Sequence, residues 1–567
     1  MFFLKFEQFE YKRPDISEIK ESLTLAIEEF SHASTADEQN ECMQRINKIR
    51  NDVDTMVNIC YIRHTIDTTD EFYKAEQDYL DEIEPELEEF VSKYYKALTE
   101  SAFRSELEEK WGIQLFALAE YQLKTFSPDI IPLLQKENKL VSEYKQLMAS
   151  AKIMFEGEER TLIQLQPFAE SEDREMRRRA SDARSGFMAE NGDKLDQIYD
   201  NLVKVRNEMA VKLGYENFVE LGYYRMARTD YNAEMVAEFR RQVKDYIVPL
   251  AVKLRERQQN RIGVDSLKFY DESFKFKSGN AAPKGEPDWI IENGRKMYNE
   301  LSPETEEFFN KMADEGLMDL VAKKGKTGGG YCTIVRNYGA PFIFSNFTGT
   351  SGDIDVLTHE AGHAFQVYMS RDYEVPEYTW PTHEACEIHS MSMEFLTWPW
   401  MELFFQGDTD KYKYTHLSES LLFLPYGVAV DEFQHFVYEH PEASPAERKT
   451  AWRNLERKYL PHRDYDGDEY LEAGGFWQRQ GHIYSTPFYY IDYTLAQICA
   501  FQFWKRSRED QKKTWKDYLD LCKQGGSKSF LALVETAGLQ SPFEDGCVLS
   551  VASVIDEYLQ SVDDQAL

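Results

Sequence analysis

Two histidines and a glutamate near the middle of the chain have the spacing that most directly indicates chemistry. His359, Glu360 and His363 form the pattern H-E-x-x-H. If this segment is helical, positions i and i+4 lie on one face, so both imidazoles can reach a single metal ion. Glu360 then lies beside them, where its carboxylate can take a proton from a water that the metal activates. The pattern therefore predicts a zinc site with one Zn²⁺ per chain.

A catalytic zinc ion needs a third protein ligand and an open position for water. Possible donors follow after Pro381, in a segment that we expect to form a second helix. Spacing alone does not choose among them. A carboxylate is favoured, because one anionic ligand beside two neutral imidazoles keeps the metal acidic enough to ionise water near pH 7. The candidates are His383, Glu384, Glu387, His389 and Glu394.

A resemblance to a known family is carried by two segments, H-E-A-G-H-A-F-Q and E-A-C-E-I-H-S-M-S-M-E-F. They resemble the oligoendopeptidase F and Pz-peptidase branch of the thimet-type zinc metallopeptidases. In that family the third ligand is the first glutamate of a pair spaced seven apart. Glu387 lies 24 residues beyond His363, and Glu394 follows seven residues later. The resemblance implies that Glu387 is the ligand, and Glu394 is either a partner that orients a ligating histidine or a surface glutamate.

The resemblance continues in the segment G-H-I-Y-S-T-P-F-Y-Y-I-D-Y, residues 481–493. In related gluzincin peptidases a histidine and a Tyr-x-x-Tyr pair close over the substrate from the opposite wall of the cleft. This implies that His482 and Tyr493 stabilise the oxyanion formed when water attacks a peptide carbonyl. Tyr490 is the expected substrate contact, and Tyr489 remains an alternative. Packing in an aromatic core would explain the same residues without any function.

Strand-like residues directly precede the H-E-x-x-H segment. Glycines at 328–330 lead into a β-branched and aromatic run over residues 331–336, and Gly339 and Pro341 turn the chain into a second run. This pattern predicts a β-hairpin whose edge strand lies beside the metal site. We expect a substrate peptide to lie extended along Gly330 and Tyr331. Binding through backbone hydrogen bonds would give it a loose sequence preference.

Much of the remaining sequence indicates helices that would position these residues. Apolar residues recur at three- and four-residue spacing over residues 16–30, 133–148 and 195–209, which is typical of amphipathic helices. Asp15 is the expected N-cap of the first helix. Ser351 or Asp353 is the expected cap of the helix that carries H-E-x-x-H.

The length of 567 residues by itself predicts about three to four domains, at roughly 150 residues each. The resemblance, however, covers nearly the whole chain and implies a mainly α fold. Two helical lobes would enclose a deep substrate cleft, and a small β-sheet would lie next to the H-E-x-x-H helix. We expect an N-terminal helical region over residues 1–195 and a catalytic region over residues 196–567. Such a cleft would admit short oligopeptides and exclude folded proteins.

The composition limits the classes of partner. The chain has 66 Lys and Arg against 100 Asp and Glu, which gives a formal net charge of −34 at pH 7. This charge repels phosphate backbones and anionic lipids, so we expect neither nucleic acid nor a membrane as a partner. The sequence begins without a secretory signal pattern and has no apolar run of 18 residues. Its seven cysteines are scattered, and these features together predict a cytoplasmic protein with reduced thiols.

The resemblance thus implies a zinc-dependent endopeptidase that hydrolyses internal bonds of short oligopeptides. Glu360 would accept a proton from the attacking water and pass it to the leaving amine. Two alternatives remain open. A zinc exopeptidase, of the dipeptidase or carboxypeptidase type, would use the same chemistry but needs a charged anchor for a peptide terminus, which the sequence does not reveal. A non-catalytic peptide-binding protein would have no need of Glu360. The oligomeric state is not determined by the sequence.

Overall fold

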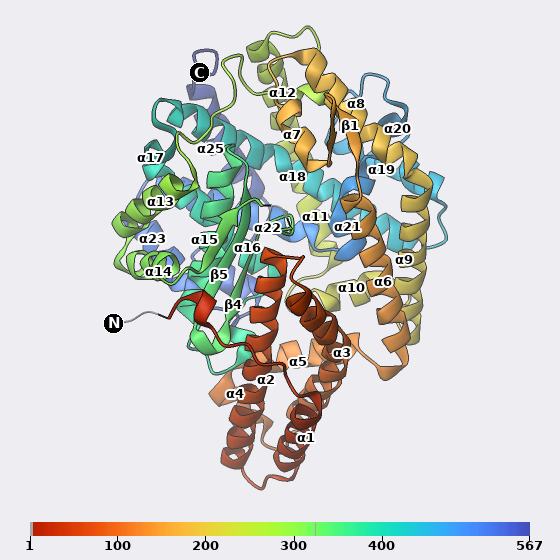
Figure 1. Ribbon diagram of the computed structural model, residues 1–567, viewed down its shortest axis with the longest axis vertical. Coiled ribbons are helices and arrows are strands. Elements are labelled where there is room, and N and C mark those ends of the chain that lie inside the picture. The colour runs from red at the N-terminus through yellow and green to blue at the C-terminus, as the bar shows by residue number, and fades with distance from the viewer. Residues whose placement is uncertain (1–3, 324) are drawn as a thin grey trace.

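Helices dominate the computed structural model, which describes residues 4–323 and 325–567. About 70% of the chain is helical and the sheets are small, so the predicted mainly α fold is confirmed (Figure 1). Within these residues no helix is both long enough and apolar enough to cross a membrane.

The N-terminal helices gather at the lower end of the molecule in Figure 1. Asp15 caps the first of them as predicted, since its carboxylate accepts hydrogen bonds from the backbone N–H groups of Ser17 and Glu18. These helices share a small core around Phe30 and Phe116, to which Val375 and Tyr378 also contribute. They are α1 (Ile16–His32), α2 (Ala36–Ile66), α3 (Glu71–Thr99), α4 (Arg104–Trp111) and α5 (Ile113–Thr125).

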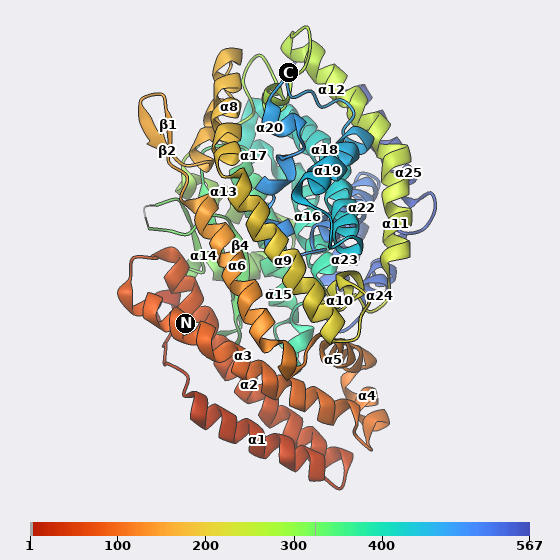
Figure 2. The same cartoon turned by 90° about the vertical axis from the view of Figure 1, so that its right-hand side faces the viewer.

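A second group of helices runs along one side of the molecule, most clearly in Figure 2. The predicted division between residues 195 and 196 falls inside one of them, α9. The group also contains a short hairpin of strands β1 (Ile153–Phe155) and β2 (Glu158–Arg160). Its helices are α6 (Ile131–Ala149), α7 (Gln166–Ala169), α8 (Arg174–Glu190), α9 (Gly192–Lys212), α10 (Phe218–Arg225), α11 (Ala233–Gln242) and α12 (Val248–Ile262).

The remaining elements share one large core with parts of the second group. The helices are α13 (Pro287–Leu301), α14 (Pro303–Asp314), α15 (Gly352–Ser370), α16 (His383–Leu396), α17 (Glu402–Phe405), α18 (Thr409–Glu439), α19 (Pro445–Tyr459), α20 (Glu469–Glu472), α21 (Gly481–Ser485), α22 (Tyr490–Ser507), α23 (Gln511–Cys522), α24 (Phe530–Thr536) and α25 (Cys547–Ser561). The strands are β3 (Met318–Val321), β4 (Tyr331–Val335) and β5 (Ala340–Phe347).

The three later strands form one sheet in the order β3-β5-β4. Strand β4 is antiparallel to β5, with Tyr331 opposite Phe344, and β3 is parallel to β5. The predicted hairpin is therefore present, and β4 lies at an edge of the sheet. Helix α15 packs against both β4 and β5, which confirms that the sheet lies next to the H-E-x-x-H helix.

Helix α16 packs between α15 and α22, and these are the most extensive contacts in the molecule. The crossing of α15 and α16 is very close at Gly362, where an added Cβ would lie 2.7 Å from the His389 carbonyl oxygen and 2.7 Å from the Ser390 Cα. Any larger residue would push the two helices apart, because backbone atoms have no room to shift. Gly362 thus sets the distance between the segments that carry the predicted metal ligands.

The predicted cap of α15 is wrong. Ser351 has helical backbone angles and its side chain makes no capping hydrogen bond. The Asp353 carboxylate instead accepts hydrogen bonds from the backbone N–H groups of Thr348 and Gly349, both at 2.8 Å. Asp353 therefore fixes the loop between β5 and α15, because the two N–H groups of that tight loop have no strand partner to pair with.

Candidate metal centre

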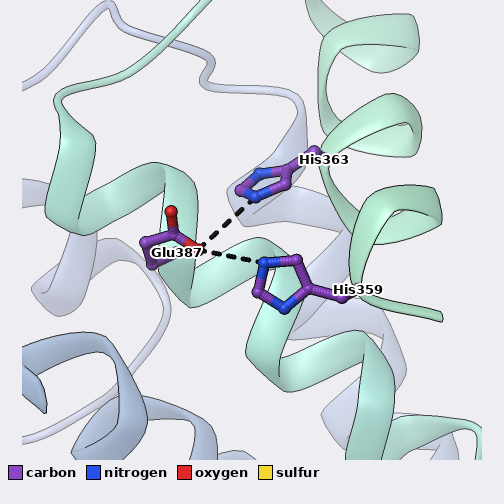
Figure 3. A group of neighbouring side chains, drawn as sticks. All are labelled: His359, His363 and Glu387. Atoms are coloured by element: carbon purple, nitrogen blue, oxygen red, sulfur yellow. Dashed lines mark ion pairs between the residues drawn. The ribbon is translucent and has the colours of Figure 1, made fainter. Parts of the chain in front are cut away.

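The two histidines of the H-E-x-x-H pattern and one glutamate of α16 converge on a common point (Figure 3). Nε2 of His359 lies 3.3 Å from Oε2 of Glu387, and Nε2 of His363 lies 3.4 Å from the same oxygen. One donor atom from each residue lies within 4.8 Å of the others, a spacing that can hold a metal ion. Two imidazole nitrogens and a carboxylate oxygen are a ligand set that zinc prefers in catalytic sites.

Three of the other candidate ligands make contacts away from His359 and His363. His389 is buried and donates its Nδ1–H to the Ala385 carbonyl at 2.7 Å. Glu384 is buried and accepts a hydrogen bond from the Thr382 hydroxyl. The ring of His383 lies against Tyr489, with 5.0 Å between centroids. Of the five candidates on α16, Glu387 is the one whose side chain reaches both histidines.

Glu394 bridges His359, a predicted ligand, to a second histidine that reasoning from the sequence missed. Its Oε1 accepts a hydrogen bond from Nδ1 of His359 at 2.7 Å, and its Oε2 accepts one from Nε2 of His416 at 2.7 Å. The Trp398 indole N–H donates to Nδ1 of His416, which therefore carries its proton on Nε2. Because Nδ1 donates to Glu394, the neutral form of His359 has its lone pair on Nε2, the nitrogen that faces Glu387. Of the two predicted alternatives for Glu394, the geometry favours the orienting partner.

Electrostatics keeps both glutamates of this cluster ionised. Burial alone would raise their pKa values, but the imidazoles outweigh it. The neighbouring His363 and His359 hold the pKa of Glu387 well below its ordinary value. Hydrogen bonds from His359 and His416 likewise lower the pKa of Glu394. The site therefore presents negative charge to a cation.

Glu360 has a buried carboxylate oxygen that the protein leaves unpaired. The residue is 8% exposed, and its Oε2 has no hydrogen-bond partner in the described part of the chain. Burial raises its pKa. An unpaired buried oxygen of this kind costs about 1–3 kcal/mol or more, so a partner such as a water held at the metal position would satisfy it. This orphaned atom beside three convergent donors fits a bound zinc ion.

Gly330, the residue directly before the edge strand β4, lies beside Glu360. An added Cβ on Gly330 would lie 3.4 Å from Oε1 of Glu360. The Tyr331 side chain turns away from it: its hydroxyl lies 2.6 Å from the Thr65 hydroxyl of α2, and its ring stacks on Phe344. At Tyr331 a peptide bound along β4 would therefore meet the backbone and not the ring.

The segment of residues 481–493 brings together the four ring side chains that the resemblance singled out. The His482 ring lies 5.7 Å from the Tyr489 ring, 5.2 Å from that of Tyr490 and 5.8 Å from that of Tyr493, between centroids. Tyr489 donates its hydroxyl proton to Oε1 of Glu387 at 2.7 Å. Tyr489, left open as an alternative, is thus the tyrosine that touches a predicted metal ligand. Tyr490 lines a neighbouring cavity.

Gln480 fixes the proton position of His482, and the motif did not reveal it. Its amide oxygen accepts a hydrogen bond from the Tyr426 hydroxyl at 2.9 Å, so its amide nitrogen faces Nδ1 of His482 at 2.7 Å. Because Nδ1 accepts this bond, the neutral ring carries its proton on Nε2. Burial lowers the pKa of His482, which favours the neutral ring. The Nε2–H group of His482 is therefore available as a hydrogen-bond donor.

A buried ion pair holds the start of α22, where the tyrosines lie. The side chains of Arg228 and Asp492 are both fully buried, and Nη2 of Arg228 lies 2.8 Å from Oδ1 of Asp492. Arg228 also donates to the Phe488 carbonyl, just before α22. The pair is not fully hydrogen-bonded, since Nε and Nη1 of Arg228 and Oδ2 of Asp492 have no partner among the described residues. Asp492 occupies the position directly before Tyr493, so this contact fixes the tyrosine's backbone.

These observations define a class of protein. Two imidazoles and a carboxylate that converge beside an unpaired buried glutamate, on the helices of a mainly α fold, are the arrangement of an H-E-x-x-H metallopeptidase.

Family models identify the particular group within this class. Residues 6–126 match the peptidase M3 N-terminal domain, and residues 168–552 match peptidase family M3. The chain belongs to peptidase family M3, a family of metallopeptidases, and the predicted resemblance is confirmed.

Individual relatives agree with this membership. The structure of a Pz peptidase A with an inhibitor is 69% identical, covers 99% of this chain and 100% of its own, and superposes with a TM-score of 0.96. A proposed oligoendopeptidase F from Bacillus anthracis strain Ames is 62% identical over 100% of this chain and 99% of its own, with a TM-score of 0.92. An oligoendopeptidase F homolog from Borreliella burgdorferi is 30% identical over 242 residues, which span 41% of this chain and 39% of that relative.

Proposed function

We propose that this chain is a zinc-dependent endopeptidase that hydrolyses internal peptide bonds of short oligopeptides. The observation that carries the proposal is the unpaired, buried Oε2 of Glu360 next to the convergent donors of His359, His363 and Glu387. Merely holding a metal does not require a buried carboxylate beside it. Hydrolysis by a metal-activated water needs a general base within reach of that water, and this carboxylate can serve as one.

Three residues would hold the metal, one Zn²⁺ per chain. His359 and His363 would each supply Nε2, and Glu387 would supply its carboxylate, with Tyr489 fixing the other carboxylate oxygen. When bound, the ion would act as a Lewis acid toward water and the substrate carbonyl.

Glu360 would move the protons of the reaction. Its carboxylate would accept a proton from the attacking water and later deliver it to the nitrogen of the leaving amine. Burial raises its pKa, which makes the carboxylate a stronger base than an exposed glutamate. The backbone of Gly330 and Tyr331, at the start of β4, would hydrogen-bond to the substrate and hold it next to this carboxylate.

His482 and Tyr493 would bind the oxyanion. The Nε2–H of His482 is a fixed donor because Gln480 occupies the other ring nitrogen. Burial and the negative charge of Glu387 raise the pKa of Tyr493, so its hydroxyl keeps its proton. Both groups are donors in a largely buried wall, where such bonds to developing charge are strongest. Tyr490 would contact the substrate farther along the same wall.

Tyr493→Phe tests this oxyanion role. Removing one such donor lowers kcat by about 10²–10³-fold, and we expect KM to change little because the bond forms only in the transition state. Steady-state kinetics on one quenched peptide measures both constants. An unchanged kcat would indicate that Tyr493 only packs against its neighbours. Tyr490→Phe, at a neighbouring tyrosine, is measured for comparison.

The proposed function is tested by mapping products on a small peptide library by mass spectrometry, with and without a chelator. We expect internal cleavage that stops when the metal is removed and returns with added Zn²⁺. Release of single residues or dipeptides from an end would favour the exopeptidase alternative, and no cleavage would favour the peptide-binding one. Denatured casein should be cleaved far more slowly than a peptide of about ten residues. Comparable rates would contradict the size limit.

We also infer a cytoplasmic location, supported by seven free cysteines in the structure, as expected where thiols stay reduced. Fractionation of cells producing the protein checks this, and recovery outside the cytoplasm would overturn it.

A further inference from the structure

A cavity of about 390 Å³ lies between α3, α5, α10 and the segment that leads into α16 (Figure 1). Trp380 and His383 connect its wall to the candidate metal centre. The Trp380 ring lies 6.4 Å from that of His363, and the His383 ring lies 5.0 Å from that of Tyr489, between centroids. The volume is in the range of about 300–1,000 Å³ typical of ligand pockets. The cavity therefore has room for a side chain of a peptide bound at the metal centre.

A smaller cavity of about 250 Å³ adjoins the first one and extends between α1, α2 and α3. The two cavities share Arg50, Glu88 and Val91 as lining residues. Most of the lining of the smaller cavity is aliphatic, including Val53 and Leu87. Aliphatic walls of this kind cover the methylene stem of a long side chain, while its polar end needs a partner of its own.

The positive charges around these cavities are compensated within the protein. Three arginines line the two cavities, and each of them forms an ion pair with a carboxylate. The pairs are Arg50 with Glu377, Arg336 with Asp54, and Arg225 with Glu137, at N–O distances of 2.6, 3.0 and 3.1 Å. These arginines are therefore not free to bind an anion.

Two carboxylates of the lining remain without a cation. Glu88 lines both cavities and Glu84, one turn earlier on α3, lines the smaller one. Among the described residues, neither carboxylate has a Lys, Arg or His nitrogen within 4.0 Å. Glu88 is half-buried and accepts a hydrogen bond from the neutral side-chain amide of Gln122. Burial raises the pKa of Glu88, and a bound cation would offset this cost of burying a charge.

Other polar atoms of the lining are buried without a partner in the described part of the chain. Oε2 of Glu377 and Oδ1 of Asn51 are unpaired acceptors, and Nε2 of Gln114 is an unpaired donor. An ammonium or guanidinium group carries several N–H donors, and a peptide carbonyl accepts one hydrogen bond or two. A basic residue of a bound peptide can thus supply both kinds of partner that this lining lacks.

We propose that Glu88 binds a lysine or arginine side chain of the oligopeptide substrate and so selects where the substrate is cleaved. This inference rests on the proposed endopeptidase function. The aliphatic walls would hold the stem of the side chain, and the carboxylate would form a charge-assisted hydrogen bond with its cationic end. The net charge of −34 attracts any cation at long range. Glu88 adds a fixed position, so the basic residue would stand at a constant number of residues from the cleaved bond.

Arginine and citrulline test this assignment, because they have nearly the same shape and only arginine is charged. One parent peptide is made with arginine or citrulline at each position in turn. For the unmodified enzyme we expect kcat/KM to be about 10-fold higher for arginine at one position, mainly through KM. Glu88→Gln should lose this preference while cleaving the citrulline peptide as well as the unmodified enzyme does. Glu89→Gln is the matched control, because Glu89 lies on the same helix but is paired with Lys93 at 2.7 Å.

Charge reversal gives a second test with the same peptides. Glu88→Lys should cleave the peptide with glutamate at the selected position faster than the one with glutamine, because the charges of cavity and substrate are exchanged. Circular dichroism checks that the variants fold. No preference for glutamate in the folded variant would contradict a direct contact between residue 88 and the substrate.

The remaining outcomes overturn the assignment or separate it from the proposed function. Equal kcat/KM for arginine and citrulline at every position would show that the cavity binds no basic side chain, and a preference that survives in Glu88→Gln would assign the cation to another group. A loss on acetylation of the N-terminus that depends on Glu88 would make the terminal ammonium the ligand. If the unmodified enzyme cleaves no peptide, the proposed function fails. Calorimetric binding then still decides: tighter binding of the arginine peptide that Glu88→Gln loses supports the contact, and equal affinity overturns it.

Discussion

Glu360→Gln should lower kcat by about 10²–10⁴-fold while the protein keeps its metal and its affinity for substrate. Glutamine has the size and shape of glutamate but cannot accept a proton from water at neutral pH. Glu360 is not expected to bind the metal, since the three donors that converge come from His359, His363 and Glu387. The change therefore removes the base and leaves the metal site intact.

The measurement is kcat on an internally quenched peptide, together with the metal content of the same sample. Glu402→Gln is the control, because Glu402 is an exposed glutamate at the start of α17. Activity above a few per cent of the unmodified enzyme in metal-loaded Glu360→Gln would rule out the general-base role. Loss of metal from this variant would instead place Glu360 among the ligands.

Glu387→Ala should release the metal and abolish hydrolysis. Glu387 supplies the one anionic donor of the set and lies between both imidazoles, and two neutral histidines alone hold a catalytic ion poorly. Glu394→Ala should act more mildly, lowering metal affinity by about 10- to 100-fold, as expected for a residue that orients a ligand. Excess Zn²⁺ should restore much of the activity of Glu394→Ala and little of that of Glu387→Ala.

Metal affinity is measured by competition with a chelator of known strength, and circular dichroism checks that each variant folds. Tyr489→Phe removes the hydrogen bond to Glu387 without touching the carboxylate and should have the smallest effect of the three. If Glu394→Ala released metal more readily than Glu387→Ala, the third ligand would have to be reassigned to Glu394.

Residue types and spacing within short segments were enough to predict several features of this protein correctly. The four-residue spacing of His359 and His363 places both on one face of any helix, and the helix itself follows from apolar periodicity. The glycines and β-branched residues before it predicted a hairpin that is present as β4 and β5. Each of these features depends on residues near one another in the chain.

Selection among distant residues needed either the family resemblance or the structure. Spacing left five candidates for the third ligand, and the resemblance chose Glu387, the one that reaches both histidines. The cap of α15 was predicted wrongly, because Asp353 bonds to backbone groups that only the tight loop exposes. His416 and Gln480 carry no motif, yet His416 holds the Glu394 carboxylate that bonds Nδ1 of His359, and Gln480 bonds Nδ1 of His482 and leaves the proton of the neutral ring on Nε2.

The sequence by itself thus predicted the chemistry: a divalent metal between two imidazoles, a glutamate base beside it, and an acidic chain from which no nucleic-acid partner is expected. Only the tertiary structure decided which groups orient that chemistry, such as Glu394 and His416 around His359, and Gln480 beside His482. The physical reason is that periodicity fixes neighbours within one helix or strand. Contacts between elements depend instead on packing, such as the crossing at Gly362 that sets the distance between α15 and α16.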